Sequence, residues 1–254
     1  MCLSIEVRDE WMQRAVVWAA RRVRYTINRA RMNERGPAEK MDDAVMGEIA
    51  SAAVAQYLDD ERGQLVLAYD DVRTDEYRDP DPGWDLACGA SLEGWPGPAD
   101  DPRTPAAGAL TFSVKSSRIP ERYGDRLADA VAACDFKVLK HSESIEEDLT
   151  SDFETQVYYE LATSRFRPGL LTTMAEIEAL DVDAIIGGLQ LKDRYSRCTL
   201  VGFASRQRIA AHSRQLARAG PPSSWLSNHA GHAKPMWIAP LTLARLPRRL
   251  GVAE

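Results

Sequence analysis

Two segments decide the fold: Pro82-Gly-Trp-Asp-Leu-Ala-Cys88 and Leu110-Thr-Phe-Ser-Val-Lys-Ser-Ser117. Both are short and rich in apolar residues, and both lie next to stretches that contain glycine and proline, which is typical of strands. In the second segment, Ser113 and Lys115 are two residues apart, so their side chains share one face of a strand. Val114 then points to the opposite layer. We therefore expect two neighbouring strands that bring an acid, a hydroxyl and an amine together.

Helical and extended patterns alternate on both sides of these segments. Apolar spacing predicts helices over residues 10–33 and 37–58, with Gly36-Pro37 as the break between them. Further strands are expected at 64–69, 136–140, 153–161 and 198–204, and further helices at 121–133, 174–180 and 206–219. Interleaved elements of this kind favour an α/β fold with a mixed central sheet flanked by helices. We expect residues 1–36 to form an N-terminal helical segment and residues 37–254 to form one α/β domain.

The composition is that of an ordinary globular protein. Of the 254 residues, 44% are hydrophobic and 28% are charged. No apolar run has the roughly 18 residues that a membrane span needs. The first ten residues contain three acids, Glu6, Asp9 and Glu10, where a secretory signal would be apolar. These features predict a cytoplasmic protein with no membrane partner.

Cysteine and histidine do not form a zinc pattern. The cysteines, Cys2, Cys88, Cys134 and Cys198, are widely separated and are expected to be free thiols. His229 and His232 are close in sequence, but a zinc ion needs more ligands than this pair supplies.

Charge is unevenly distributed along the chain. The formal net charge is −6, which does not by itself indicate a nucleic-acid partner. Arginines nevertheless gather in three clusters, Arg14 to Arg35, Arg206 to Arg218 and Arg245 to Arg249, whereas acids concentrate at 59–101 and 143–154. This segregation is compatible with one cationic face and one acidic site, and equally with solvated helix faces.

The two central segments carry the groups that phosphodiester cleavage requires. A divalent cation must neutralise the phosphate, a water must be activated, and a cationic group must stabilise the developing charge. Asp85 on the first strand and Ser113 and Lys115 on the second supply an acid, a neutral ligand and an ammonium group. The backbone carbonyl of Val114 is a further candidate ligand. Mg²⁺ suits such a site because it binds through one or two carboxylates and keeps several waters.

At these residues the sequence resembles the PD-(D/E)xK nuclease superfamily, which includes many restriction endonucleases. The family pattern is a helix with a Glu, a strand with an Asp, and a strand reading (D/E)-x-K. Glu48, Asp85 and Ser113-Val-Lys115 follow that order. The resemblance implies a restriction-endonuclease-like core, with Glu48 and Asp85 as metal ligands and Lys115 as the catalytic cation. Ser113 stands where the family usually has an acid, and its neutral hydroxyl is a weaker ligand.

The resemblance also implies the activity and the partners. We expect a Mg²⁺-dependent DNA endonuclease, with Mn²⁺ able to substitute, in restriction or phage defence. Cutting both strands would call for a homodimer. The alternatives are a repair or recombination nuclease, a DNA-binding module that has lost catalysis, and an intracellular protein without a nucleic-acid partner.

Other polar residues near these segments are weaker candidates. Gln156 lies on a neighbouring predicted strand and is a candidate to face the site. Asp70 and Asp71 form an acid pair, but their place in a predicted loop favours solvated side chains.

Overall fold

The computed structural model describes residues 2–25, 35–63, 65–166, 174–179, 181–219, 226–227 and 236–246. Its helices are α1 (Asp9–Val23), α2 (Pro37–Arg62), α3 (Tyr69–Val72), α4 (Leu127–Ala133), α5 (Ile145–Asp148), α6 (Leu161–Ser164), α7 (Met174–Glu178), α8 (Val182–Gly188), α9 (Leu191–Tyr195) and α10 (Arg206–Ala219). Its strands are β1 (Leu3–Glu6), β2 (Val66–Ala68), β3 (Leu86–Cys88), β4 (Leu110–Arg118), β5 (Asp135–Leu139), β6 (Phe153–Tyr159), β7 (Arg197–Ser205), β8 (Leu226–Ser227) and β9 (Met236–Pro240).

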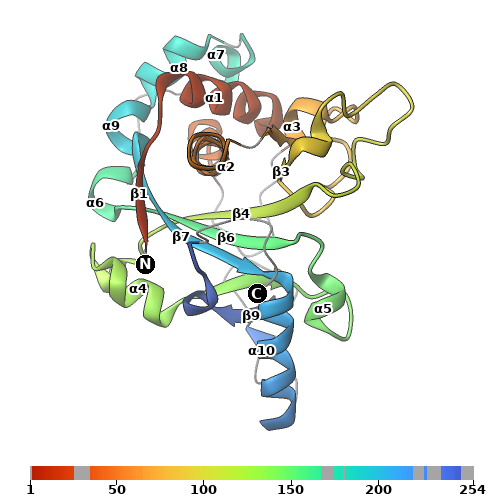
Figure 1. Cartoon of the computed structure of the whole chain (residues 1–254). Helices are drawn as coiled ribbons and strands as arrows, with labels where there is room; N and C mark the ends of the chain where they lie inside the picture. Colours follow the sequence, from red (N-terminus) through yellow and green to blue (C-terminus); the bar gives the residue numbers. More distant parts are fainter. Residues whose placement is uncertain are drawn as a thin grey trace.

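The main sheet has six strands in the order β1-β7-β6-β4-β3-β2. The pair β4 and β6 is parallel, and the other neighbours are antiparallel, so the sheet is mixed. Helices α1 and α2 lie on one side of it, whereas β9 and α10 lie on the other (Figure 1). The expected α/β class with a mixed sheet flanked by helices is therefore confirmed at this level.

Helix α2 is the element around which the larger core forms. Pro37 occupies its first turn, where a missing N–H is harmless, and Gly63 ends it in the left-handed conformation with φ +57°. Its side chains are buried on several faces, because it lies between α1 and the main sheet (Figure 1). Met41, Val45 and Ile49 are completely buried. A helix packed on both sides holds its polar residues in fixed positions, and Glu48 is one of them.

A second, smaller sheet lies outside the main one. It has the order β5-β9-β8 and packs a separate hydrophobic cluster that includes Phe136 and Trp237. Val201 and Ala204 of β7 also belong to this cluster, so it lies on the side of the main sheet opposite α2. The strand predicted at 136–140 is confirmed as β5, and it belongs to this second sheet.

Several predicted elements differ from the structure at their boundaries. The helix predicted at 10–33 begins at Asp9 and ends at Val23, and residues 26–34 lie outside the described part of the chain. The strand predicted at 64–69 is shorter, because Tyr69 already begins α3. The segment predicted as purely helical, residues 1–36, also contributes β1, which pairs with β7 in the main sheet. Both β1 and α1 supply side chains to the larger core.

A buried ionic network fixes α2 against β4 and α9. Asp42 of α2 is completely buried and accepts two hydrogen bonds from Arg194, at 2.6 and 2.8 Å. The same carboxylate accepts from Arg118 at the end of β4 (2.7 Å) and from the Tyr195 hydroxyl (3.0 Å). Each charge in this network has an opposite partner, as buried charges require. The network thus sets the position of α2 relative to the strand that carries Ser113 and Lys115.

We predict that Asp42→Asn lowers the free energy of unfolding by about 3–5 kcal/mol, because it leaves the buried Arg194 charge without its anion. Chemical denaturation followed by circular dichroism measures this. Asp193→Asn changes the same residue type at an exposed position of α9 and should stay within about 0.5 kcal/mol of wild type. Equal unfolding midpoints for both variants would contradict the role assigned to Asp42.

Candidate active site

Strand β4 presents the lysine and the serine on one face. The Lys115 Nζ donates a hydrogen bond to the Ser113 hydroxyl at 2.7 Å. Val114 packs against the core on the α2 side of the sheet, as its place in the alternation predicts. Lys115 itself is exposed, whereas Ser113 is 4% exposed. The shared face predicted for Ser113 and Lys115 is confirmed.

Asp85 lies immediately before β3, and its side chain binds the neighbouring strand β4. Its Oδ2 accepts a hydrogen bond from the Val114 N–H at 2.6 Å, and its own N–H donates to the Phe112 carbonyl at 2.8 Å. The register of β3 and β4 ends at the pair Leu86 and Phe112, so the carboxylate replaces the next strand residue as the partner of β4. Asp85 is therefore held at the point where the two strands separate.

The Val114 carbonyl lies on the same edge of β4. In a strand, the N–H and C=O of one residue point to the same side. Since the Val114 N–H points to Asp85, its carbonyl oxygen also faces the Asp85 side. This orientation is compatible with the expected role of the carbonyl as a metal ligand.

The Asp85 carboxyl is buried, and the Lys115 ammonium opposes the effect of that burial. Burial raises the pKa of Asp85, and the Lys115 ammonium is the largest influence that lowers it, followed by the Val114 N–H. Lys115 has the same effect on one further acid of the site. It opposes the rise in the pKa of Glu154 on β6 that burial causes. Burial outweighs the ammonium, so the pKa of Asp85 stays above its ordinary value.

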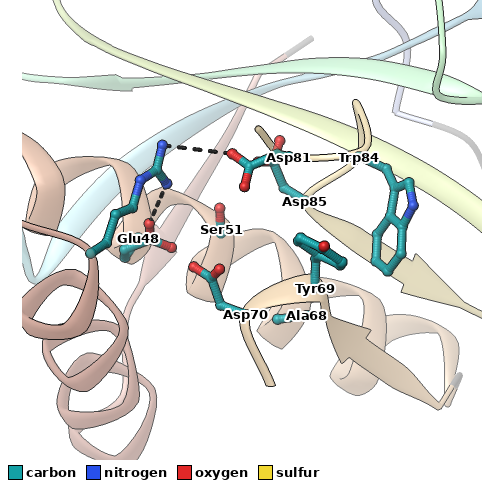
Figure 2. Close-up of a pocket in the computed structure, with 9 residues that line it drawn as sticks. Glu48, Ser51, Ala68, Tyr69, Asp70, Asp81, Trp84 and Asp85 are labelled. Atoms are coloured by element: carbon teal, nitrogen blue, oxygen red, sulfur yellow. Dashed lines mark hydrogen bonds and ion pairs between the residues drawn. The ribbon is translucent and has the colours of Figure 1, made fainter. Parts of the chain in front are cut away.

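A pocket opens beside Asp85 on the α2 side. It is small and partly open to solvent, with about 10 Å³ available to the centre of a water molecule. Figure 2 shows Glu48 and Ser51 from α2, Asp70 from α3, and Asp81 and Asp85 from the segment before β3 around it. Tyr69 and Trp84 form its apolar wall. Acids from three separate segments therefore meet in one concavity.

Glu48 is buried in this pocket and paired with an arginine. It is 5% exposed, and its Oε1 accepts from Arg22 of α1 at 2.7 Å. Arg22 also lies 3.8 Å from Asp81, so its guanidinium bridges two acids (Figure 2). Burial raises the pKa of Glu48 to about 8; Arg22 opposes this, and Asp70 and Asp85 add to it. Burial therefore outweighs the pairing of Glu48 with Arg22.

Asp70 belongs to the site, and the prediction that it is a solvated loop acid is wrong. Its side chain is 10% exposed and accepts from Arg73 at 3.1 Å. Burial raises its pKa, and Arg73 and Arg22 lower it. Arg73 also binds Asp75 and Asp81, so one buried arginine fixes the loop that supplies the acids. Asp71 points elsewhere and accepts from the Trp18 indole at 2.9 Å.

Glu154 is the acid that the sequence reasoning missed. It lies on β6 directly opposite Ser113 and is 5% exposed. Burial raises its pKa, Lys115 and Ser151 lower it, Asp85 raises it further, and Ser113 contributes a weaker lowering. An acidic residue among apolar ones in the strand Phe153-Glu-Thr-Gln-Val-Tyr-Tyr was the available signal. Gln156, the next candidate on that face, is opposite Lys115 and donates to the Val157 carbonyl at 2.9 Å.

Comparison with protein-family models, with curated proteins and with solved structures gives no match for this chain.

The predicted residues thus form two groups that meet at Asp85. Glu48 lies with Asp70, Asp81 and Arg22 in the pocket, whereas Ser113 and Lys115 lie with Glu154 on the sheet face. Among the described residues, no group of three or more His, Cys, Asp or Glu side chains is already arranged to hold a metal ion. A Mg²⁺ site needs only one or two carboxylates, because waters and phosphate oxygens complete its shell.

Other predicted features lie away from this site. All four cysteines are free; Cys88 and Cys198 are buried, and Cys2 and Cys134 are half-buried. His229 and His232 lie outside the described residues. Within the described part of the chain, no helix has the length and apolar character to cross a membrane.

We predict that Glu48→Gln stabilises the protein at pH 8 relative to wild type, in the presence of chelator. The folded-state pKa of Glu48 is about 8 against an ordinary value of 4.5, so the folded protein holds this proton more tightly than the unfolded chain. Wild-type stability therefore falls as pH rises between these values, and glutamine removes that loss.

Thermal unfolding of both proteins at pH 5 and pH 8 measures the effect. The difference in melting temperature between Glu48→Gln and wild type should become more favourable to the variant from pH 5 to pH 8. Glu39→Gln, in the first turn of the same helix, serves as the control and should follow wild type at both values. A melting difference between Glu48→Gln and wild type that is the same at both pH values would contradict the prediction.

Proposed function

We propose that the protein hydrolyses DNA phosphodiester bonds with the help of Mg²⁺ bound at Asp85. The observation that carries the proposal is the position of Asp85, whose carboxylate accepts the Val114 N–H at 2.6 Å on the strand that carries Lys115. Acid, backbone and ammonium are thus arranged around one edge of β4. The family resemblance of Glu48, Asp85 and Ser113-Val-Lys115 supports DNA as the substrate.

The donor set suits a hard divalent cation. Carboxylate and carbonyl oxygens are the ligands that Mg²⁺ prefers, and Asp85, Glu48 and the Val114 carbonyl supply them. The raised pKa values of Asp85, Glu48 and Asp70 reflect negative charge that burial disfavours and a cation would stabilise. Bound Mg²⁺ supplies charge neutralisation at the phosphate and favours ionisation of a water.

The roles of the chain's own side chains follow from their positions. Lys115 is exposed beside Ser113, and in this proposal it holds a water or a phosphate oxygen while Ser113 orients its ammonium group. Arg22 lies between Glu48 and Asp81 in the pocket, and in this proposal its guanidinium contacts a phosphate. Arg21 and Arg24 are exposed at the same end of α1 and would bind backbone phosphates without reading sequence.

Restriction or phage defence remains part of the proposal through the resemblance, as does a homodimer for cutting both strands. Cleavage assays on plasmid, branched and single-stranded DNA separate this role from repair or recombination. A binding module without catalysis is favoured by one observation, the neutral Ser113 in the place of an acid. DNA binding without metal uptake or cleavage would identify that module.

We predict that Asp85→Asn and Lys115→Ala each lower plasmid cleavage in Mg²⁺ by at least about 100-fold, because each removes a group that acts on the reacting phosphate. Wild-type protein should cut in Mg²⁺ or Mn²⁺ and stop in excess chelator. Gel analysis of plasmid forms over time provides the rates.

Two surface variants are matched controls. Asp193→Asn and Lys192→Ala make the same changes on exposed positions of α9 and should cut at the wild-type rate. Circular dichroism must show that all four variants are folded. Cleavage by folded Asp85→Asn at the rate of Asp193→Asn would reject the assignment of the site.

A further inference from the structure

Glu154 has an arrangement that its role in the fold does not explain. It lies in the interior strand β6, between β4 and β7, and is 5% exposed. Its Oε1 accepts a hydrogen bond from Ser151 at 3.0 Å, whereas its Oε2 is buried and has no hydrogen-bond partner among the described residues. A buried carboxylate oxygen without a partner is costly and calls for an explanation, of which a bound ion is one.

The surroundings of Glu154 are those of the proposed metal site. In the parallel pair of β4 and β6, Glu154 is the register partner of Ser113, and Gln156 is the partner of Lys115. The Lys115 ammonium and the Asp85 carboxylate both act on the Glu154 carboxyl group. Neighbouring strands lie about 4.8 Å apart, so Glu154 needs only its own side-chain length to reach the position beside Ser113.

We propose that Glu154 is a ligand of the divalent cation and supplies from β6 the carboxylate that Ser113 does not supply from β4. The inference rests on the proposed function, because it assigns a further ligand to that site. Asp85 and Glu154 then provide two carboxylates, and the Val114 carbonyl faces the same edge of the strand as Asp85. The remaining positions are open to waters and a phosphate oxygen, as Mg²⁺ prefers.

Ser113 acquires a different role in this arrangement. Its hydroxyl accepts from Lys115 at 2.7 Å, so it positions the ammonium group and need not bind the cation. An acid at this position would lie directly beside Glu154, and two buried carboxylates at one register position would repel each other. An acid on β4 and an acid on β6 are therefore alternatives, and this chain has the acid on β6.

Metal binding tests the proposal independently of cleavage. Isothermal titration with Mn²⁺, and the rise in melting temperature that Mn²⁺ produces, report uptake by the full chain. We expect Glu154→Gln to weaken Mn²⁺ binding by at least about tenfold and to slow plasmid cleavage, because an isosteric amide is a poorer ligand. Glu160→Gln, an exposed position just after β6, should bind and cut as wild type does.

Moving the acid back to β4 distinguishes ligation from a structural role. We expect Ser113→Asp, added to Glu154→Gln, to restore Mn²⁺ binding and part of the cleavage activity. Mn²⁺ affinity of Glu154→Gln equal to wild type would overturn the inference, and so would failure of the folded double variant to regain binding. The proposed function would still stand if Asp85→Asn abolished uptake and cutting. Absence of Mn²⁺ uptake and of cleavage in wild type would overturn both.

Discussion

The contact between the Asp85 carboxylate and the Val114 N–H is the constraint on which the site depends. Strand β3 is short, so β4 continues past it with one edge free of a strand partner from Val114 onward. The Asp85 side chain takes that N–H at 2.6 Å and so fixes the acid on the edge of the strand that carries Lys115. Where a strand separates from its neighbour, its backbone groups and side chains are exposed together. A ligand can therefore contact both kinds of group at this point.

The other elements serve to bring buried charge to this point. Asp42 ties α2 to β4 through Arg118 and to α9 through Arg194, which places Glu48 beside the separating strands. Arg73 fixes the loop that carries Asp70 and Asp81. Burial raises the pKa values of Glu48, Asp70, Asp85 and Glu154, so the fold holds its acids where their ionised forms are disfavoured. A protein tolerates such a cost at a functional site, and the core around α2 supplies the stability that offsets it.

Local patterns in the sequence were sufficient for the central elements. The alternation around Val114 predicted β4 and the shared face of Ser113 and Lys115, and the apolar spacing after Pro37 predicted α2. The same patterns could not show that Glu48 is buried, because α2 packs on both sides and has no simple polar face. Asp70 looked like a loop acid because neither the short helix α3 nor the burial of this side chain is evident from the local pattern. Glu154 was missed because its partner Ser113 is set by the parallel register of β4 and β6, which no local pattern encodes.

The most direct test of the account is the location of a bound divalent cation. Crystals grown with Mn²⁺, with anomalous diffraction measured at the manganese absorption edge, would show the ion without reference to activity. The account predicts an anomalous peak about 2.1 Å from an Asp85 oxygen, on the side of β4 that the Val114 carbonyl faces. Ordered density for Asp85 with no peak beside it, at Mn²⁺ concentrations that support cleavage, would contradict it.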